Sequence, residues 1–120
     1  MTMILLLGFE NPLRDDLVRV LTGLRYVVGI QGFQDEWLAQ REAHLVFCSG
    51  DDPRFRNALR DARFLRPDLP LVVVTRLPEV SAWLDALEAG AADYCSAPFE
   101  PIQMRWVLNS ALPQRQMAAA

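Results

Sequence analysis

Oxygen-bearing side chains gather directly after one apolar stretch of the chain, at Ser49, Asp51 and Asp52. Carboxylates can attack electrophilic groups, and they can hold Mg²⁺, a hard cation that prefers oxygen ligands. Asp51 and Asp52 are therefore candidate acceptors or metal ligands, and Glu10 offers a further carboxylate. The structural alternative is a solvated turn in which Asp52 caps a helix that begins near Pro53.

Other pairings of reactive side chains are excluded by distance. Ser49 and His44 lie at opposite ends of one predicted strand, about 16 Å apart at the usual rise per residue, whereas a nucleophile and its base need hydrogen-bond contact. Cys48 and Cys95 belong to strands two spacings apart, about 9.6 Å, which a disulfide cannot bridge. Burial habit predicts that Cys48 is a core thiol. Because no base lies near a nucleophile, we expect the protein not to be an enzyme.

Five short apolar runs must position these groups, and each is typical of a buried strand in a parallel sheet. They lie at Met3–Leu7 and at residues 25–30, 44–49, 71–74 and 92–96. The fourth run ends on Thr75. Because ligands of open parallel sheets bind at the carboxyl ends of the strands, Thr75 and Ala97 are expected at the working edge.

Amphipathic segments alternate with the runs and predict five helices. They lie at residues 12–24, 33–41, 53–65 and 100–112, with one more from Val80 to just before Gly90. Strands that alternate with helices predict an α/β fold, a doubly wound (βα)5 flavodoxin-like sandwich with strand order 2-1-3-4-5. Residues 1–112 are expected to form the domain, and residues 113–120 a linker or disordered tail.

The composition sets outer limits on function. The chain has 120 residues, 52% of them hydrophobic, a net charge of -3, and no lysine among its basic residues. An acidic chain of this kind does not favour direct nucleic-acid binding, which needs clustered positive charge. No apolar run is long enough for a membrane span, so a cytoplasmic protein is the simplest expectation.

The chain resembles the receiver domains of two-component response regulators, the CheY-like family, over nearly its whole length. The motifs that carry the resemblance are RPDLPLVVVT at residues 66–75, LEAGAADY at 87–94, and the pair Pro98-Phe99. The family accepts a phosphoryl group on an aspartate beside a bound Mg²⁺. The resemblance implies the same doubly wound fold and a role in phosphorelay signal transduction.

Most of the family's chemical groups are missing here. Its acidic pair falls on Phe9 and Glu10, and its acceptor aspartate falls on Ser49. Its hydroxyl survives as Thr75, but its lysine position is Ala97. A serine hydroxyl is un-ionised at neutral pH, and its phosphate would be a stable ester rather than an acyl phosphate.

These departures predict a degenerate, or pseudo-, receiver that keeps the switch position Tyr94 and acts by protein–protein interaction, without a cofactor. Two alternatives stay open. One is a phosphoacceptor that uses Asp51 or Asp52 with Glu10, with Mg²⁺ held weakly by Glu10 and Asp51. The other is a small-ligand site, made less polar by the same departures. The expected lining of that site is Phe9, Ser49, Thr75 and Ala97.

Apolar side chains on the last two helices predict a contact surface. In the last helix, Met104 and Leu108 should face the sheet. Because residues two apart differ by about 200° around a helix, Ile102 and Trp106 then face outward. An exposed tryptophan of this kind marks a partner surface, although Trp106 could instead cover a neighbouring loop. With Trp83, these residues predict a homodimer through the fourth and fifth helices, or a contact with an output domain.

Overall fold

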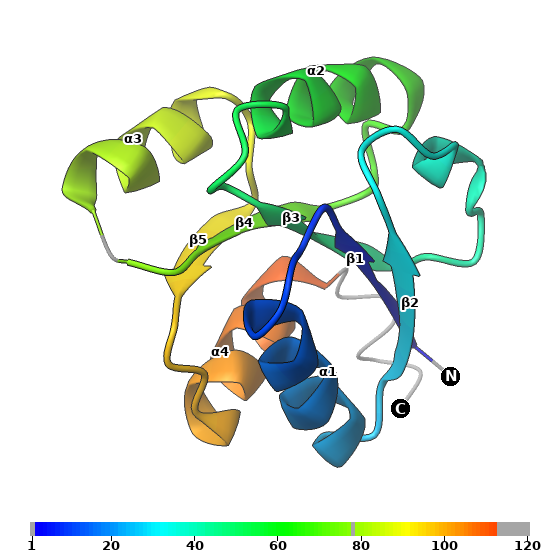
Figure 1. The fold of residues 1–120 in the computed structure, drawn as a ribbon. Coiled ribbons are helices and arrows are strands. Elements are labelled where there is room, and N and C mark those ends of the chain that lie inside the picture. Colours follow the sequence, from blue (N-terminus) through cyan, green and yellow to red (C-terminus); the bar gives the residue numbers. More distant parts are fainter. Residues whose placement is uncertain (1, 78, 113–120) are drawn as a thin grey trace.

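Five parallel strands form one sheet in the order β2-β1-β3-β4-β5 (Figure 1). The computed structural model describes residues 2–77 and 79–112. The strands are β1 (Met3–Leu7), β2 (Val27–Gln31), β3 (Leu45–Ser49), β4 (Leu71–Thr75) and β5 (Asp93–Ser96). The predicted fold class and strand order are confirmed, and the strand bounds differ from the predicted ones by one or two residues, as helix and strand ends commonly do.

Helices cover both faces of the sheet. They are α1 (Leu13–Gly23), α2 (Phe55–Leu65), α3 (Val80–Glu88) and α4 (Pro101–Ala111). Figure 1 shows α1 and α4 on one face, and α2 and α3 on the other. The predicted linker or tail at residues 113–120 lies outside the described residues.

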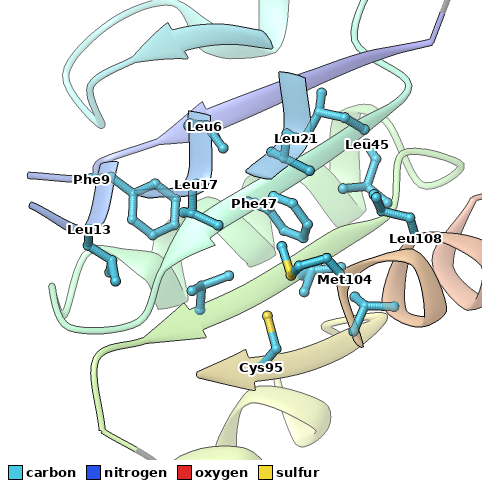
Figure 2. Packing of buried hydrophobic residues seen from close by; sticks show 14 of the residues in the cluster. Leu6, Phe9, Leu13, Leu17, Leu21, Leu45, Phe47, Cys95, Met104 and Leu108 are labelled. Carbon is cyan, nitrogen blue, oxygen red and sulfur yellow. The ribbon is translucent and has the colours of Figure 1, made fainter. Parts of the chain in front are cut away.

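Each face of the sheet has its own hydrophobic core. On the α1–α4 side, Leu6 and Phe47 from the central strands pack with Met104 and Leu108 of α4 (Figure 2). On the other side, Val46 and Cys48 pack with residues of α2. The pattern follows from strand geometry, since successive side chains point to opposite faces. The continuous apolar sequence of β3 and β4 is therefore explained by burial on both sides.

The helix predicted at residues 33–41 is wrong. In its place the structure has a single 3-10 turn, η1 (Trp37–Ala39). The Asp35 carboxylate accepts a hydrogen bond from the Gly32 N–H at 2.7 Å, a local bond that competes with helix formation. Trp37 is buried in the core on the α2 side, so one large side chain anchors this connection where a full helix was expected.

The outer helices bury less apolar surface than the sequence suggests. Leu65 at the end of α2 is exposed. On α3, Ala86 is buried, and Asp85 accepts a hydrogen bond from Arg56 of α2 at 3.2 Å. Because Trp83 and Leu87 lie about 160° around the helix from Asp85, they face away from α2. Trp83, Leu84 and Leu87 are accordingly exposed.

Candidate functional site

A cavity of about 320 Å³ opens at the carboxyl ends of β1 and β3. Its lining comes from the loops after β1, β3 and β4. The lining residues are Gly8, Glu10, Asn11, Leu13, Ser49, Asp51, Asp52, Pro53 and Arg76. The structure thus brings together Ser49, Asp51, Asp52 and Glu10, which the sequence placed at the same edge.

Ser49 ends β3 and lines this cavity although only 5% of its surface is exposed. It shares the sheet face of Phe47, while Cys48 points into the opposite core. Gly50 lets the backbone directly after β3 pass close to β4, because a Cβ on residue 50 would lie 2.6 Å from Val73 Cγ1. Among the described residues, the Ser49 hydroxyl has no hydrogen-bond partner in the protein.

Both aspartates after β3 are held by arginines that the sequence analysis did not single out. Asp52 forms an ion pair with Arg54 at 2.7 Å, and the Asp51 carboxylate accepts from the Arg76 backbone N–H at 3.2 Å. The Arg54 side chain and its backbone N–H lower the pKa of Asp52 below its ordinary value. Asp52 is not the N-cap of α2 as predicted, since α2 begins at Phe55 and its N-cap is Arg54. The Asp52 carboxylate instead accepts from the Arg54 N–H, in the turn that directly precedes the helix.

An aromatic ring ties the loop after β2 to this edge of the sheet. Gly8 adopts φ +80°, and a Cβ there would overlap the Phe33 ring. The Arg54 guanidinium lies 5.2 Å from the centre of the same ring, a favourable cation–π geometry. No recognisable motif contains Phe33, Arg54 or Arg76. Their place beside the cavity results from the packing of three separate loops, which the sequence does not show.

Three residues proposed as the lining of a small-ligand site do not line the cavity. Phe9 is buried in the α1–α4 core, because its ring points inward beside Leu13 and Leu17 (Figure 2). Thr75 is buried, and Ala97 packs against the same core as Phe9. The predicted apolar pocket is therefore wrong: the polar groups that line the cavity are three carboxylates, one amide, one hydroxyl and one guanidinium.

Thr75 and Tyr94 form a hydrogen-bonded pair beside the cavity. Their hydroxyl oxygens lie 2.6 Å apart, and the Thr75 hydroxyl donates to the Leu77 carbonyl oxygen at 2.9 Å. The Tyr94 hydroxyl also lies 3.4 Å from the Leu77 carbonyl oxygen and can donate to it, so either hydroxyl can be the donor of the 2.6 Å bond. The Tyr94 oxygen in turn accepts from the Glu79 N–H at 3.4 Å. The two hydroxyls thus fasten the connection between β4 and α3.

The cavity does not fit Mg²⁺. Three or more carboxylate, imidazole or thiolate groups arranged to hold a metal ion occur nowhere in residues 2–77 and 79–112. Asp52 is occupied by Arg54, and Asp51 lies against Arg76. Of the three carboxylates that line the cavity, only that of Glu10 has no arginine ion-pair partner among the described residues, and a hard divalent cation needs several oxygen ligands.

The other predicted positions are placed without contact to the cavity. His44 lies at the opposite end of β3 from Ser49, and its Nδ1 accepts from the Met3 N–H at 2.9 Å. Cys48 and Cys95 are free and buried. Ile102 and Trp106 are 81% and 77% exposed, so the tryptophan does not cover a neighbouring loop.

Solved structures of similar shape define the class of fold. A response regulator receiver domain protein from Clostridium thermocellum superposes with a TM-score of 0.82 over 98% of this chain and 99% of that chain, at 14% identity. NtrX from Brucella abortus gives a TM-score of 0.82 at 21% identity, over 99% of this chain and 28% of its own. The fold is that of CheY-like response-regulator receiver domains.

A similarity in sequence points in the same direction. The alginate biosynthesis transcriptional regulatory protein AlgB of Pseudomonas putida is 32% identical in an alignment that covers 88% of this chain and 26% of that protein. AlgB of Pseudomonas aeruginosa shows the same identity and coverage. The chain thus spans about a quarter of the length of these relatives. No family model matches the chain. None of the described helices is long and apolar enough to cross a membrane.

Proposed function

We propose that this chain is a receiver-type signalling module that acts by contact with a protein partner and not by accepting a phosphoryl group. The observation that carries the proposal is the hydroxyl of Ser49 at the carboxyl end of β3, in the place where the resemblance expects the acceptor aspartate. A neutral hydroxyl is a weak nucleophile unless a base activates it. His44, the sole histidine, lies at the other end of the strand.

The ion pairs support the same reading. Asp52 is engaged by Arg54 at 2.7–3.1 Å through three side-chain hydrogen bonds, and Asp51 lies against Arg76. A carboxylate bound in this way is less available as a nucleophile. With no lysine in the chain and no fit to Mg²⁺, little would neutralise the charge that develops on a transferred phosphoryl group.

Contact surfaces that suit a partner lie on the two helices nearest β5. Trp83 and Leu84 are exposed on α3, and Ile102 and Trp106 are exposed on α4. Tryptophans are enriched among the residues that dominate binding energy at interfaces. We propose that these helices contact a second copy of the chain, a partner or an output domain in the cytoplasm. The coverage of about a quarter of AlgB is consistent with an output domain in such relatives.

The test is incubation with acetyl phosphate and Mg²⁺, followed by intact-mass measurement. We expect no mass gain of one phosphoryl group, while an authentic receiver domain treated in parallel should gain it. A labile, hydroxylamine-sensitive adduct would refute the proposal. If the adduct is lost in Asp51→Asn or in Asp52→Asn, the residue changed in that variant is the acceptor. If it is also lost in Glu10→Gln, Glu10 is the carboxylate that supports the acceptor.

A further inference from the structure

The cavity beside Ser49 contains a hydrogen-bonding group that the protein leaves unused. The Ser49 hydroxyl lines the cavity, is 95% buried as a residue, and finds no partner among the described residues. None of the described side-chain nitrogen or oxygen atoms is both buried and without a hydrogen-bond partner, so the Ser49 oxygen itself is open to the cavity. Water satisfies it there, and a molecule that enters the cavity can replace that water.

The carboxylates around this hydroxyl differ in how fully they are used. Asp52 accepts short bonds from Arg54 on both of its oxygens. Asp51 makes only long contacts with Arg76, of 3.2–3.6 Å, which leaves lone pairs free. Glu10 has no ion-pair partner within residues 2–77 and 79–112.

The charges at the cavity decide what kind of ligand fits. Glu10, Asp51 and Asp52 face two guanidiniums, those of Arg54 and Arg76, so one negative charge is in excess. An anion would be repelled by the unpaired carboxylate. A divalent cation would find too few free carboxylates, as shown above. A group with a single positive charge and several N–H donors matches the excess charge and the free acceptors.

We propose that the cavity binds a primary ammonium group, with Glu10 and Asp51 as charged acceptors and Ser49 as the neutral acceptor at its base. The proposal rests on the proposed function, because it assigns the site to ligand binding in place of phosphoryl transfer. Residues 1–120 contain no lysine, so none of their side chains supplies the ammonium group. It is either the lysine side chain of a protein partner or a free small amine.

The experiment records amide NMR spectra of isotope-labelled full-length protein during titration with n-butylammonium chloride at neutral pH. Titration with n-butanol is the matched control, because it has nearly the same size and no charge. We expect shifts at the amides of Ser49, Gly50 and Glu10 with the amine, and much smaller shifts with the alcohol. Ser49→Ala and Glu10→Gln should each weaken amine binding by about fivefold, the scale of one exposed ion pair or one neutral hydrogen bond.

A second arm separates the two sources of the ammonium group. It compares a short blocked peptide that contains one lysine with the same peptide that contains norleucine. Tighter binding of the lysine peptide than of butylammonium indicates a protein partner, and the reverse indicates a free amine. Equal shifts with amine and alcohol, absent shifts, or unchanged affinity in both folded variants would overturn the proposal. None of these outcomes alters the acetyl phosphate result, so the two proposals fail separately.

Discussion

Removal of the Tyr94 hydroxyl by Tyr94→Phe tests the bonded pair that joins β5 to the connection before α3. The hydroxyl oxygen lies 2.6 Å from that of Thr75, with which it shares a hydrogen bond, and it accepts from the Glu79 N–H at 3.4 Å. The ring can stay in place, because phenylalanine differs only by the oxygen. The perturbation therefore isolates the hydrogen bonds from the packing.

The expected magnitude follows from the number and length of the bonds. A typical protein hydrogen bond contributes a net of about 0.5–1.5 kcal/mol to the free energy of unfolding. The contact with Glu79 is too long to add much, so Tyr94→Phe should cost about 1 kcal/mol. Thr75→Val should cost more, because it also leaves the Leu77 carbonyl oxygen without its 2.9 Å donor. The double variant should show a coupling of about 1 kcal/mol between the two side chains.

Urea denaturation of the unchanged protein, the two single variants and the double variant measures these free energies of unfolding. The comparison holds if m, the slope of the free energy against urea concentration, is the same for all four proteins. Hydrogen exchange should also accelerate at the amides of Leu77 and Glu79 in Tyr94→Phe, because the connection before α3 loses its fastening. Tyr26→Phe is the matched control, since none of the described hydrogen bonds uses the Tyr26 hydroxyl. Additive costs and unchanged exchange would refute the role assigned to the pair.

Further predictions concern charge, burial and assembly. The Arg54→Gln variant should raise the pKa of Asp52 in an NMR titration but leave it below its ordinary value, because the backbone N–H of residue 54 still donates to the carboxylate. Because the folded pKa is lowered, the Asp52–Arg54 pair stabilises the protein above the unfolded pKa of Asp52, and its contribution is lost as the pH falls through the folded pKa. Burial raises the pKa of Cys95 to about 12 and also raises that of Cys48, so neither thiol should react with iodoacetamide at pH ~8 until urea unfolds the protein. Trp106→Glu should convert a dimer to a monomer in sedimentation measurements, and a wild-type protein that is monomeric at high concentration would contradict the predicted dimer.

The fold could be predicted from the sequence because the relevant signals are local and repeated. Apolar runs such as Met3–Leu7 are buried on both faces wherever they sit in a parallel sheet. Helical periodicity correctly placed Met104 and Leu108 inward and Trp106 outward. Right-handed crossovers then restrict the strand order to very few solutions. The edge where Ser49, Asp51 and Thr75 meet follows from the same topology.

The details of the site depended on contacts between distant segments, which no local pattern records. Arg54 and Arg76 are ordinary charged residues in the sequence, yet they occupy the two aspartates because three loops converge. Phe9 looked like a lining residue, but burial of its ring was worth more than exposure to a polar cavity.

Hydrophobic spacing alone favoured a helix at residues 33–41. The bond from Gly32 to Asp35 and the buried Trp37 outweighed that tendency. On α3, the bridge from Arg56 to Asp85 lies opposite the exposed Trp83, which follows the orientation fixed by the buried Ala86. The sheet, its strand order and the two cores follow from the pattern of apolar residues, since burial of apolar area is the dominant favourable term in folding. Which polar groups are paired and which, like the Ser49 hydroxyl, stay free depends on the folded arrangement, because pairing requires side chains from separate loops to meet within hydrogen-bond distance.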